Sequence, residues 1–405
     1  MKPLQEKLSL YTLPQQIKSK GIYPFYHPLQ TGQDTEVMIY GQSVLMFGSN
    51  SYLGLTNHPE LKLAAKNAIQ KYGTGASGSR LMNGNLDLHE ELEFVLAKFV
   101  NKPAVAVFST GFQANIGAIS TLLGRNDFLI IDEKDHASII EGCRLSFAKT
   151  LKYKHNDMES LESALQKTDP NQIRLIITDG VFSMEGDVAK LDRICQLAEQ
   201  YNASVMVDDA HGLGVMGPLG SGTVSHFNLT CKTDIIMGTF SKSLASLGGF
   251  IASDFETINY LKHHARSLLF SASIPPSSAA TALKAIEIIK REPERIVRLW
   301  DNTHYARQCL LDEDFSLGNS ITPIIPIFVG DEIETYTLAS SLIKKGLYVN
   351  PAVHPAVKKT EAILRFSLMA THTKLQIEHA VDILTKTRDS IKNTLLTDKI
   401  LHESD

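Results

Sequence analysis

The fold is decided by residues 204–211, which read Ser204-Val205-Met206-Val207-Asp208-Asp209-Ala210-His211. A short apolar run that ends in two acids and a histidine is typical of a strand buried on both faces of a sheet. The acids have two interpretations: a structural ion pair or helix cap, or a counter-charge for a cationic ligand such as a protonated pyridine nitrogen.

The glycines that follow this stretch match the GxGxxG spacing of dinucleotide-binding sites, at Gly212, Gly214 and Gly217. Such a site requires a helix directly after the glycines. Here Pro218 and Gly220 predict a loop instead, so we exclude a nicotinamide or flavin site.

Similar apolar runs recur on both sides of residues 204–211, with helical patterns such as Asp157–Lys167 and Leu191–Tyr201 between most of them. This alternation predicts an α/β fold with a mostly parallel sheet. The expected strands are Ala104–Ser109, Phe128–Asp132, Leu151–His155, Leu175–Asp179, Ser204–Asp208, Asp234–Gly238 and Gly249–Ala252.

The two ends of the chain have a different character. The segments expected there are a polar N-terminal helix, a hairpin at Glu36–Leu45, a long helix at Pro275–Arg291, strands at Ile324–Val329 and Ile363–Ser367, and a final helix from Lys374. We therefore divide the chain into an N-terminal segment at 1–45, a large domain at 46–290 and a small α+β domain at 291–405.

Composition excludes several classes of protein. The 405 residues include 40 Lys+Arg and 44 Asp+Glu, a formal net charge of −4, and 43% are hydrophobic. These values are typical of a globular protein, and the slight acidic excess argues against nucleic-acid binding. The four cysteines form no CxxC pattern, so we expect neither disulfides nor a metal site. The N-terminus lacks the apolar core of a signal peptide, and we expect a cytoplasmic protein.

Chemically active side chains follow several of the expected strands, where ligands bind in open α/β sheets. Lys242 lies in a Ser/Gly-rich loop; partial desolvation there would favour the neutral amine that a Schiff base needs, and a solvated surface lysine is the alternative. Ser109-Thr110-Gly111-Phe112 precedes a helical stretch, so it predicts either an anion site or an ordinary N-cap. His136 could face the same edge or be a structural histidine.

Taken together, these stretches supply a lysine, an acid, two histidines, a phosphate-binding loop and several hydroxyl groups at the ends of one sheet. Pyridoxal 5′-phosphate (PLP) requires a lysine for its Schiff base, an Asp at its ring nitrogen and fixed donors for its phosphate. The sequence therefore predicts a PLP site.

Stretches along most of the chain match one family of PLP enzymes in the same order. They are Ser49–Leu55, Gly73–Arg80, Ser109–Phe112, Asp135–Ser138, Asp179–Asp187, Asp208–His211 and Thr239–Lys242. The chain thus resembles the α-oxoamine synthases, which have the aspartate-aminotransferase fold (fold type I). This resemblance implies a mostly parallel seven-stranded sheet in a large domain, with a smaller α+β C-terminal domain.

The resemblance also implies a role for each candidate residue. Lys242 would hold the cofactor and later move the substrate Cα proton, and Asp208 would pair with the pyridine nitrogen, with Asp209 as the alternative. His136 would stack on the ring and help to hold the substrate carboxylate. The other implied contacts are Gly111, Phe112, Thr239 and Ser241 with phosphate, Ser183 and His211 with the phenolic oxygen, Ser271 with a neighbouring subunit's phosphate, and Arg365, Asn50 and Ser77 with the substrate.

Within the family, the closest parallels are to the branch that condenses L-serine with palmitoyl-CoA, giving 3-oxosphinganine, CoA and CO2. The stretches that carry them are Asp34–Met38, Leu45–Asn50 and Arg365–His372. This would make the chain an acyltransferase of sphingolipid biosynthesis and a homodimer with shared active sites, in which peripheral contact with the inner membrane stays open because substrate and product are apolar.

Two alternatives remain at this point. The first is a sibling that uses glycine or alanine, such as 2-amino-3-ketobutyrate CoA ligase or 8-amino-7-oxononanoate synthase, since a pocket discriminates weakly between serine and alanine unless buried groups bind the hydroxyl. The second is a non-catalytic subunit that keeps the fold; the presence of Lys242 argues against it.

Overall fold

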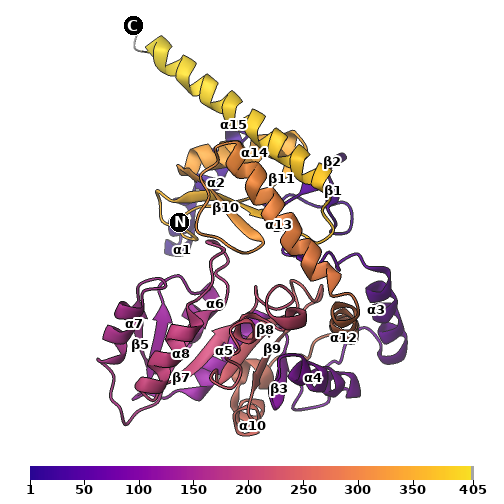
Figure 1. Ribbon diagram of the computed structural model, residues 1–405, viewed down its shortest axis with the longest axis vertical. Helices are drawn as coiled ribbons and strands as arrows, with labels where there is room; N and C mark the ends of the chain where they lie inside the picture. The colour runs from indigo at the N-terminus through magenta and orange to yellow at the C-terminus, as the bar shows by residue number, and fades with distance from the viewer. Residues whose placement is uncertain (403–405) are drawn as a thin grey trace. The chain divides into compact units, whose positions relative to one another are not determined.

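The structure, a computed structural model, describes residues 1–402, with side chains described through residue 393. It comprises two compact units (Figure 1), one formed by Asn50–Leu299 and the other by Met1–Ser49 together with the chain from Trp300 onward. The sequence-based division into three parts differs from this arrangement. Residues 1–45 are not a part of their own, because Leu45 pairs in a parallel register with Leu347 far along the chain.

The larger unit is built on a seven-stranded sheet in the order β3-β9-β8-β7-β6-β4-β5. Its antiparallel member is β9, and the other neighbouring pairs run parallel. The carboxyl ends of all strands except β9 therefore share one edge, and the predicted fold class is confirmed. The strands are β3 (Ala104–Phe108), β4 (Phe128–Asp132), β5 (Lys149–Tyr153), β6 (Arg174–Asp179), β7 (Ser204–Asp208), β8 (Ile235–Thr239) and β9 (Gly249–Ser253).

The observed strand bounds lie within one residue of the predicted ones except in β5. That strand begins and ends two residues earlier than predicted. The reason is its position at the edge of the sheet, where Lys149, Thr150 and Lys152 are exposed and no continuous apolar run marks the strand.

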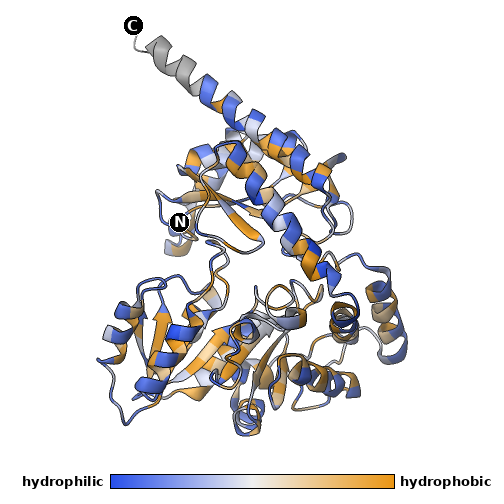
Figure 2. Cartoon of the chain, viewed as in Figure 1, coloured by the Kyte–Doolittle hydropathy of each residue, from blue (hydrophilic) through white to orange (hydrophobic). Residues whose placement is uncertain are grey.

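Helices cover both faces of this sheet. Every residue of β4, β6, β8 and β9 is buried, although successive side chains in a strand point to opposite faces. Figure 2 shows the apolar strands and the polar outer surfaces of the helices. The helical segments of this unit are α3 (Pro59–Tyr72), α4 (Asp87–Phe99), α5 (Gly111–Leu122), α6 (Ala137–Leu145), α7 (Met158–Leu165), α8 (Leu191–Gln200), the 3-10 turn Pro218–Gly220, α9 (Thr223–His226), α10 (Phe255–His264), α11 (Arg266–Leu269) and α12 (Pro276–Arg291).

The smaller unit contains two three-stranded sheets, in the orders β1-β2-β11 and β10-β13-β12. Their strands are β1 (Glu36–Ile39), β2 (Gln42–Met46), β10 (Ile324–Gly330), β11 (Leu347–Tyr348), β12 (Asn350–Ala352) and β13 (Ala362–Ser367). The helices are α1 (Pro3–Ser9), α2 (Leu13–Ser19), α14 (Glu332–Lys344) and α15 (Lys374–His402), and α13 (Glu294–Asp312) begins in the larger unit.

The N-terminus holds two short helices where the sequence predicted one. Pro14 lies in the first turn of α2. A proline fits there because its missing N–H has no partner in a helix start, whereas in a continuous helix it would break a hydrogen bond.

No helix in residues 1–402 is both long enough and apolar enough to cross a membrane.

Glu93 of α4 covers the outer edge of the sheet. Its Oε1 accepts hydrogen bonds from the Val107 N–H of the edge strand β3 at 3.0 Å and from Arg80 Nη1 at 2.8 Å. Its Oε2 lies 2.7 Å from Lys262 Nζ. Because the side chains of Arg80 and Glu93 are only 11% and 8% exposed, loss of the carboxylate would leave a buried guanidinium without its ionic partner.

We therefore expect Glu93→Ala to lower the free energy of unfolding by about 3 kcal/mol, the cost of breaking a buried ion pair. The matched control is Glu199→Ala, which removes an exposed pair with Lys232 and should cost less than about 1 kcal/mol. Urea denaturation followed by circular dichroism measures both, and equal losses would contradict the argument.

Candidate active site

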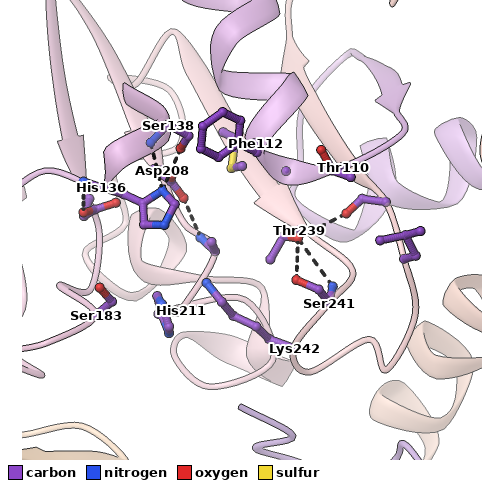
Figure 3. Close-up of a pocket in the computed structure, with 16 residues that line it drawn as sticks. Thr110, Phe112, His136, Ser138, Ser183, Asp208, His211, Thr239, Ser241 and Lys242 are labelled. Carbon is purple, nitrogen blue, oxygen red and sulfur yellow. Dashed lines mark hydrogen bonds between the residues drawn. The ribbon is translucent and has the colours of Figure 1, made fainter. Parts of the chain in front are cut away.

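A cavity of about 300 Å³ lies at the carboxyl edge of the large sheet, at the lower end of the size range of small-molecule sites. Figure 3 shows Thr110, Thr239 and Ser241 at one end, with His136, Asp208, Ser183 and His211 at the other; Lys242 extends between them. The lining residues are Thr110, Gly111, Phe112, His136, Ser138, Asp179, Ser183, Asp208, Ala210, His211, Met237, Thr239, Ser241, Lys242, Leu247 and Gly248.

The N-terminus of α5 forms the first end of the cavity. Thr110 caps the helix, its Oγ1 accepting a hydrogen bond from the Gln113 N–H at 3.1 Å. The N–H groups of Gly111 and Phe112 belong to the first turn and have no acceptor within the helix. A Cβ at Gly111 would lie 2.9 Å from Thr239 Oγ1, so the close approach of this helix end to β8 requires glycine.

The hydroxyl groups of Thr239 and Ser241 lie beside this helix end, with their oxygens 3.0 Å apart. First-turn amides, hydroxyl donors and the positive end of the helix dipole together make a site for a phosphate group.

The two adjacent acids at the end of β7 have different surroundings. Asp208 lines the cavity; its Oδ2 accepts from Asn115 Nδ2 at 2.6 Å and its Oδ1 from the Ala210 N–H at 3.0 Å. Asp209 is absent from the cavity lining, and its carboxylate accepts from the backbone N–H and hydroxyl of Thr223 at 2.7 and 2.6 Å. Asp208 is therefore the acid that a ligand in the cavity can meet.

Burial raises the pKa of Asp209 to about 6, against the lowering effect of the Thr223 hydrogen bonds. The role of the Asp209 carboxyl is therefore structural, since the glycine-rich loop that follows β7 encloses it. That loop continues after Gly217 as the 3-10 turn Pro218–Gly220, so the helix that a dinucleotide site needs does not follow.

His136 caps α6 and faces the cavity. Its ring Nδ1 lies 2.7 Å from Ser138 Oγ, and its backbone N–H donates to Asp179 Oδ2 at 2.9 Å. Burial lowers the pKa of His136, the nearby Lys242 lowers it further, and Asp208 raises it. The ring is thus held in place and favours the neutral form.

The acids behind His136 are strongly perturbed. Burial raises the pKa of Asp179 well above its usual value, and the neighbouring carboxylates Asp208 and Asp135 raise it further. Burial likewise raises the pKa of Asp135, with Asp132 adding to the effect. A cationic ligand in the cavity would therefore be stabilised by the surplus of carboxyl groups.

Lys242 and His211 come from the loops after β8 and β7. The His211 Nδ1 lies 2.7 Å from the Tyr52 hydroxyl, which fixes the ring next to the cavity. Lys242 lines the cavity together with Asp208 and His136.

The donor set fits the PLP expected from the sequence. One cavity is lined by the amine of Lys242, the carboxylate of Asp208, the imidazole of His136 and the phosphate-binding donors at the N-terminus of α5. Figure 3 shows them in the order that PLP would need, with the phosphate-binding donors at one end and Asp208 at the other. The strongest support for this fit is the space next to Gly111 at the start of α5, which any larger side chain at that position would fill.

Four predicted residues do not line this cavity. Asn50 Oδ1 accepts a hydrogen bond from the Tyr52 hydroxyl at 3.4 Å, and Ser77 lies in the loop before α4. Ser271 Oγ accepts from Gln113 Nε2 of the same chain at 3.2 Å. Arg365 is buried on β13 of the smaller unit, where Nη1 donates to Ser367 Oγ at 2.8 Å.

Sequence reasoning missed two residues that orient the predicted ones. Asn115 is fully buried and donates to both Asp208 and Ser138, and Tyr52 contacts His211. The signal for Asn115 was available: an amide in an otherwise apolar helix is costly to bury unless it has partners.

Comparisons with known proteins agree with this geometry. A family model described as aminotransferase class I and II matches residues 42–384. The serine palmitoyltransferase of Sphingobacterium spiritivorum is 54% identical over 383 residues, which is 95% of this chain and 96% of that one. The 8-amino-7-oxononanoate synthase of Alkaliphilus metalliredigens is 42% identical and covers 92% of this chain and 94% of its own.

A solved structure gives the same result. The serine palmitoyltransferase from S. paucimobilis with a bound PLP–myriocin aldimine superposes with a TM-score of 0.94 at 32% identity, covering 97% of this chain and 100% of its own.

Proposed function

Because the chain belongs to the aminotransferase class I and II family, and within it to the α-oxoamine synthases, we propose that it catalyses the serine palmitoyltransferase reaction. L-serine and palmitoyl-CoA would be converted to 3-oxosphinganine, CoA and CO2. The observation that carries this proposal is the cavity that combines Lys242, Asp208 and His136 with a phosphate cradle. The higher identity to a serine-using relative, 54% against 42%, favours serine over the alanine-type siblings.

PLP supplies an electron sink that stabilises negative charge at the substrate Cα. We propose that the PLP phosphate is held by Gly111, Phe112, Thr239 and Ser241. Ser183 and His211 would contact its phenolic oxygen, and Asp208 would pair with its ring nitrogen. Asp208 retains acceptor capacity, since each carboxylate oxygen has one hydrogen bond from the protein.

Lys242 is proposed to anchor the cofactor and then to move the proton at the substrate Cα. An amine can accept that proton only when it is neutral.

His136 is proposed to orient the substrate, through its ring and together with Arg365, Asn50 and Ser77. The bond to be broken at Cα must stand perpendicular to the cofactor ring. The contacts of its Nδ1 with the hydroxyl and the N–H of Ser138 favour one orientation of the ring, which suits a residue that sets this angle.

Arg365 is proposed to bind the substrate carboxylate in a bidentate manner. A guanidinium buried on a strand is preorganised, because its side chain has few rotamers left to lose.

A homodimer with shared sites is a further part of the proposal. Phe112 and Leu247 line the cavity yet are 43% and 51% exposed, and Phe270 is 76% exposed. A second copy would cover such apolar surface, and Ser271 next to Phe270 would reach its phosphate site. Sedimentation equilibrium measures the mass; a monomer at micromolar concentration would contradict this part.

The proposed location is the cytoplasm, with peripheral contact at the inner membrane. Helix α1 buries none of its residues and exposes Leu4 and Leu8 beside Lys2 and Lys7. Apolar residues flanked by lysines bind anionic lipid surfaces. Co-sedimentation with phosphatidylglycerol vesicles should fall severalfold in the double variant Leu4→Gln/Leu8→Gln, but not in the control Leu63→Gln, which changes another exposed leucine. Equal binding of the wild type and both variants would contradict the membrane contact.

Lys242→Ala should remove the visible absorbance of the lysine-bound cofactor and lower the condensation rate about a thousandfold, as loss of a proton-transfer group does. Lys232→Ala, which changes an exposed lysine of the same unit, is the control and should behave like the wild type. Absorbance spectra and CoA release measure the two effects. A Lys242→Ala protein that keeps its colour and turns over would overturn the assignment.

Titration of the holoenzyme with L-serine, glycine and L-alanine, each followed by palmitoyl-CoA, tests the substrate. We expect serine to saturate the spectral change at the lowest concentration, and mass spectrometry to identify 3-oxosphinganine. Preference for glycine or alanine would transfer the proposal to a sibling synthase, and a protein that never takes up PLP would favour the non-catalytic subunit.

A further inference from the structure

His155 lies outside the cavity, two residues after the end of β5, and bridges two carboxylates. Its Nδ1 is 3.0 Å from Asp132 Oδ1 at the end of β4, and its Nε2 is 3.0 Å from Asp187 Oδ2. A neutral imidazole carries one N–H, so donation to both carboxylates requires the doubly protonated ring. Burial lowers the pKa of His155, but the hydrogen bonds to the two aspartates outweigh it and raise the pKa to about 9.

Asn156 also binds both carboxylates, Asp132 through its backbone N–H and Asp187 through its side chain. Its N–H donates to Asp132 Oδ2 at 2.9 Å, while its Nδ2 donates to Asp187 Oδ2 at 3.0 Å and to the Val188 carbonyl at 3.2 Å. Two consecutive residues thus hold the end of β4 to the segment 181–188, here called the 181–188 loop.

The 181–188 loop carries a cavity residue. Val181 and Val188 form a bridge that closes it, and Ser183 of the loop lines the cavity. The buried Phe182 packs edge-on against the His155 ring, with centroids 4.4 Å apart. The Phe182 N–H also donates to the Asp187 carbonyl at 3.0 Å, so a shift of Asp187 would move the residue before Ser183.

The other carboxylate, Asp132, is linked to a second residue of the cavity, His136. The Asp132 N–H donates to Asp135 Oδ2 at 2.9 Å, and Asp135 Oδ1 accepts from the Asp179 N–H at 3.0 Å. Asp179 in turn accepts from the His136 N–H at 2.9 Å. The His155 imidazolium is therefore linked through Asp187 to the loop that carries Ser183, and through Asp132 to His136.

We propose that His155, as an imidazolium between Asp132 and Asp187, is a positioning residue that fixes Ser183 and His136 for the ligand of the cavity. The proposal rests on the proposed function only for the identity of that ligand, PLP. His155 touches neither substrate nor cofactor in this assignment and acts through the two aspartates.

The bridge has a direction in pH. Because the folded-state pKa is raised from 6.5 to about 9, the bridge is complete at pH values below about 6.5 and is lost as the pH rises through 9. The charged groups facing His155 are Asp132 from β4 and Asp187 from the loop. The Lys134–Glu185 pair, 2.7 Å apart, is a second charged link between the same segments.

The test is amide hydrogen exchange of peptides covering residues 180–190, in the full chain without PLP. His155→Gln keeps a hydrogen-bonding amide but carries no charge, and exchange at pH 7.5 should be about tenfold faster than in the wild type. His263→Gln, which changes an exposed histidine on α10, should leave it unchanged. Protection factors, corrected for intrinsic exchange rates, should fall between pH 8 and 9.5 in the wild type and stay flat in His155→Gln.

A second readout is the dissociation constant of PLP, measured by fluorescence quenching. We expect about tenfold weaker binding in His155→Gln and in Asp187→Asn, and no further loss in the double variant, because both remove the same link. Should His155→Gln fail to fold, Asp187→Asn alone carries the exchange measurement.

Unchanged exchange and PLP affinity in folded His155→Gln, or in Asp187→Asn where His155→Gln does not fold, would overturn the proposal. Equal pH profiles in the wild type and His155→Gln would also overturn it, since they would leave His155 a packing role only. A wild-type chain that does not bind PLP would refute the proposed function instead, and the exchange data would still decide the role of His155.

Discussion

Asp132, Asp179 and Asp208 end the neighbouring strands β4, β6 and β7, and all three are buried. A buried carboxylate must find donors, because desolvation of an unpaired charge is costly. Here many of the donors are backbone N–H groups. The N–H of Lys134 donates to Asp132, that of His136 to Asp179, and that of Ala210 to Asp208. The chain after β4 and the chain after β7 are therefore bent into turns, and the turn after β4 is also tied to the end of β6, which places these residues along one edge of the sheet.

This constraint links folding to the proposed chemistry. The turn that satisfies Asp208 leads to His211, and the N–H that satisfies Asp179 is that of His136 itself. Residues that line the cavity are thus placed by hydrogen bonds that stabilise the fold. Burial, together with the proximity of several carboxyls, raises the pKa of Asp135 and Asp179, so the edge favours cations and resists further negative charge. A cationic ring nitrogen is favoured there, whereas a substrate carboxylate needs a separate cation, for which Arg365 is proposed.

Much of this arrangement could be predicted from the sequence, for identifiable reasons. Strands buried on both faces are continuous apolar runs, so β4, β6 and β7 were located almost to the residue, and the residues at their ends were predicted to meet because parallel strands share one edge. The edge strand β5 was misplaced by two residues because its exposed lysines interrupt the pattern.

Other features depend on contacts between distant residues. Adjacent acids point in different directions from a strand end, but only the position of Thr223 reveals that Asp209 is the enclosed one. His155 carried no local signal, since its meaning comes from Asp132 and Asp187, 23 and 32 residues away. The joining of the N-terminal segment to the C-terminal part likewise depends on one long-range strand pair, Leu45 with Leu347.

The shared edge also explains why this chain is similar both to serine palmitoyltransferases and to 8-amino-7-oxononanoate synthases. Asp208, Lys242 and the N-terminus of α5 are proposed to bind groups that belong to the cofactor, and these groups do not change when serine is replaced by alanine. Discrimination requires buried groups that hydrogen-bond the serine hydroxyl, since a site left with unpaired polar groups rejects the analogue that lacks it. Specificity is therefore expected to be set by a few residues around the substrate side chain, while the carboxylate edge and its turns stay the same.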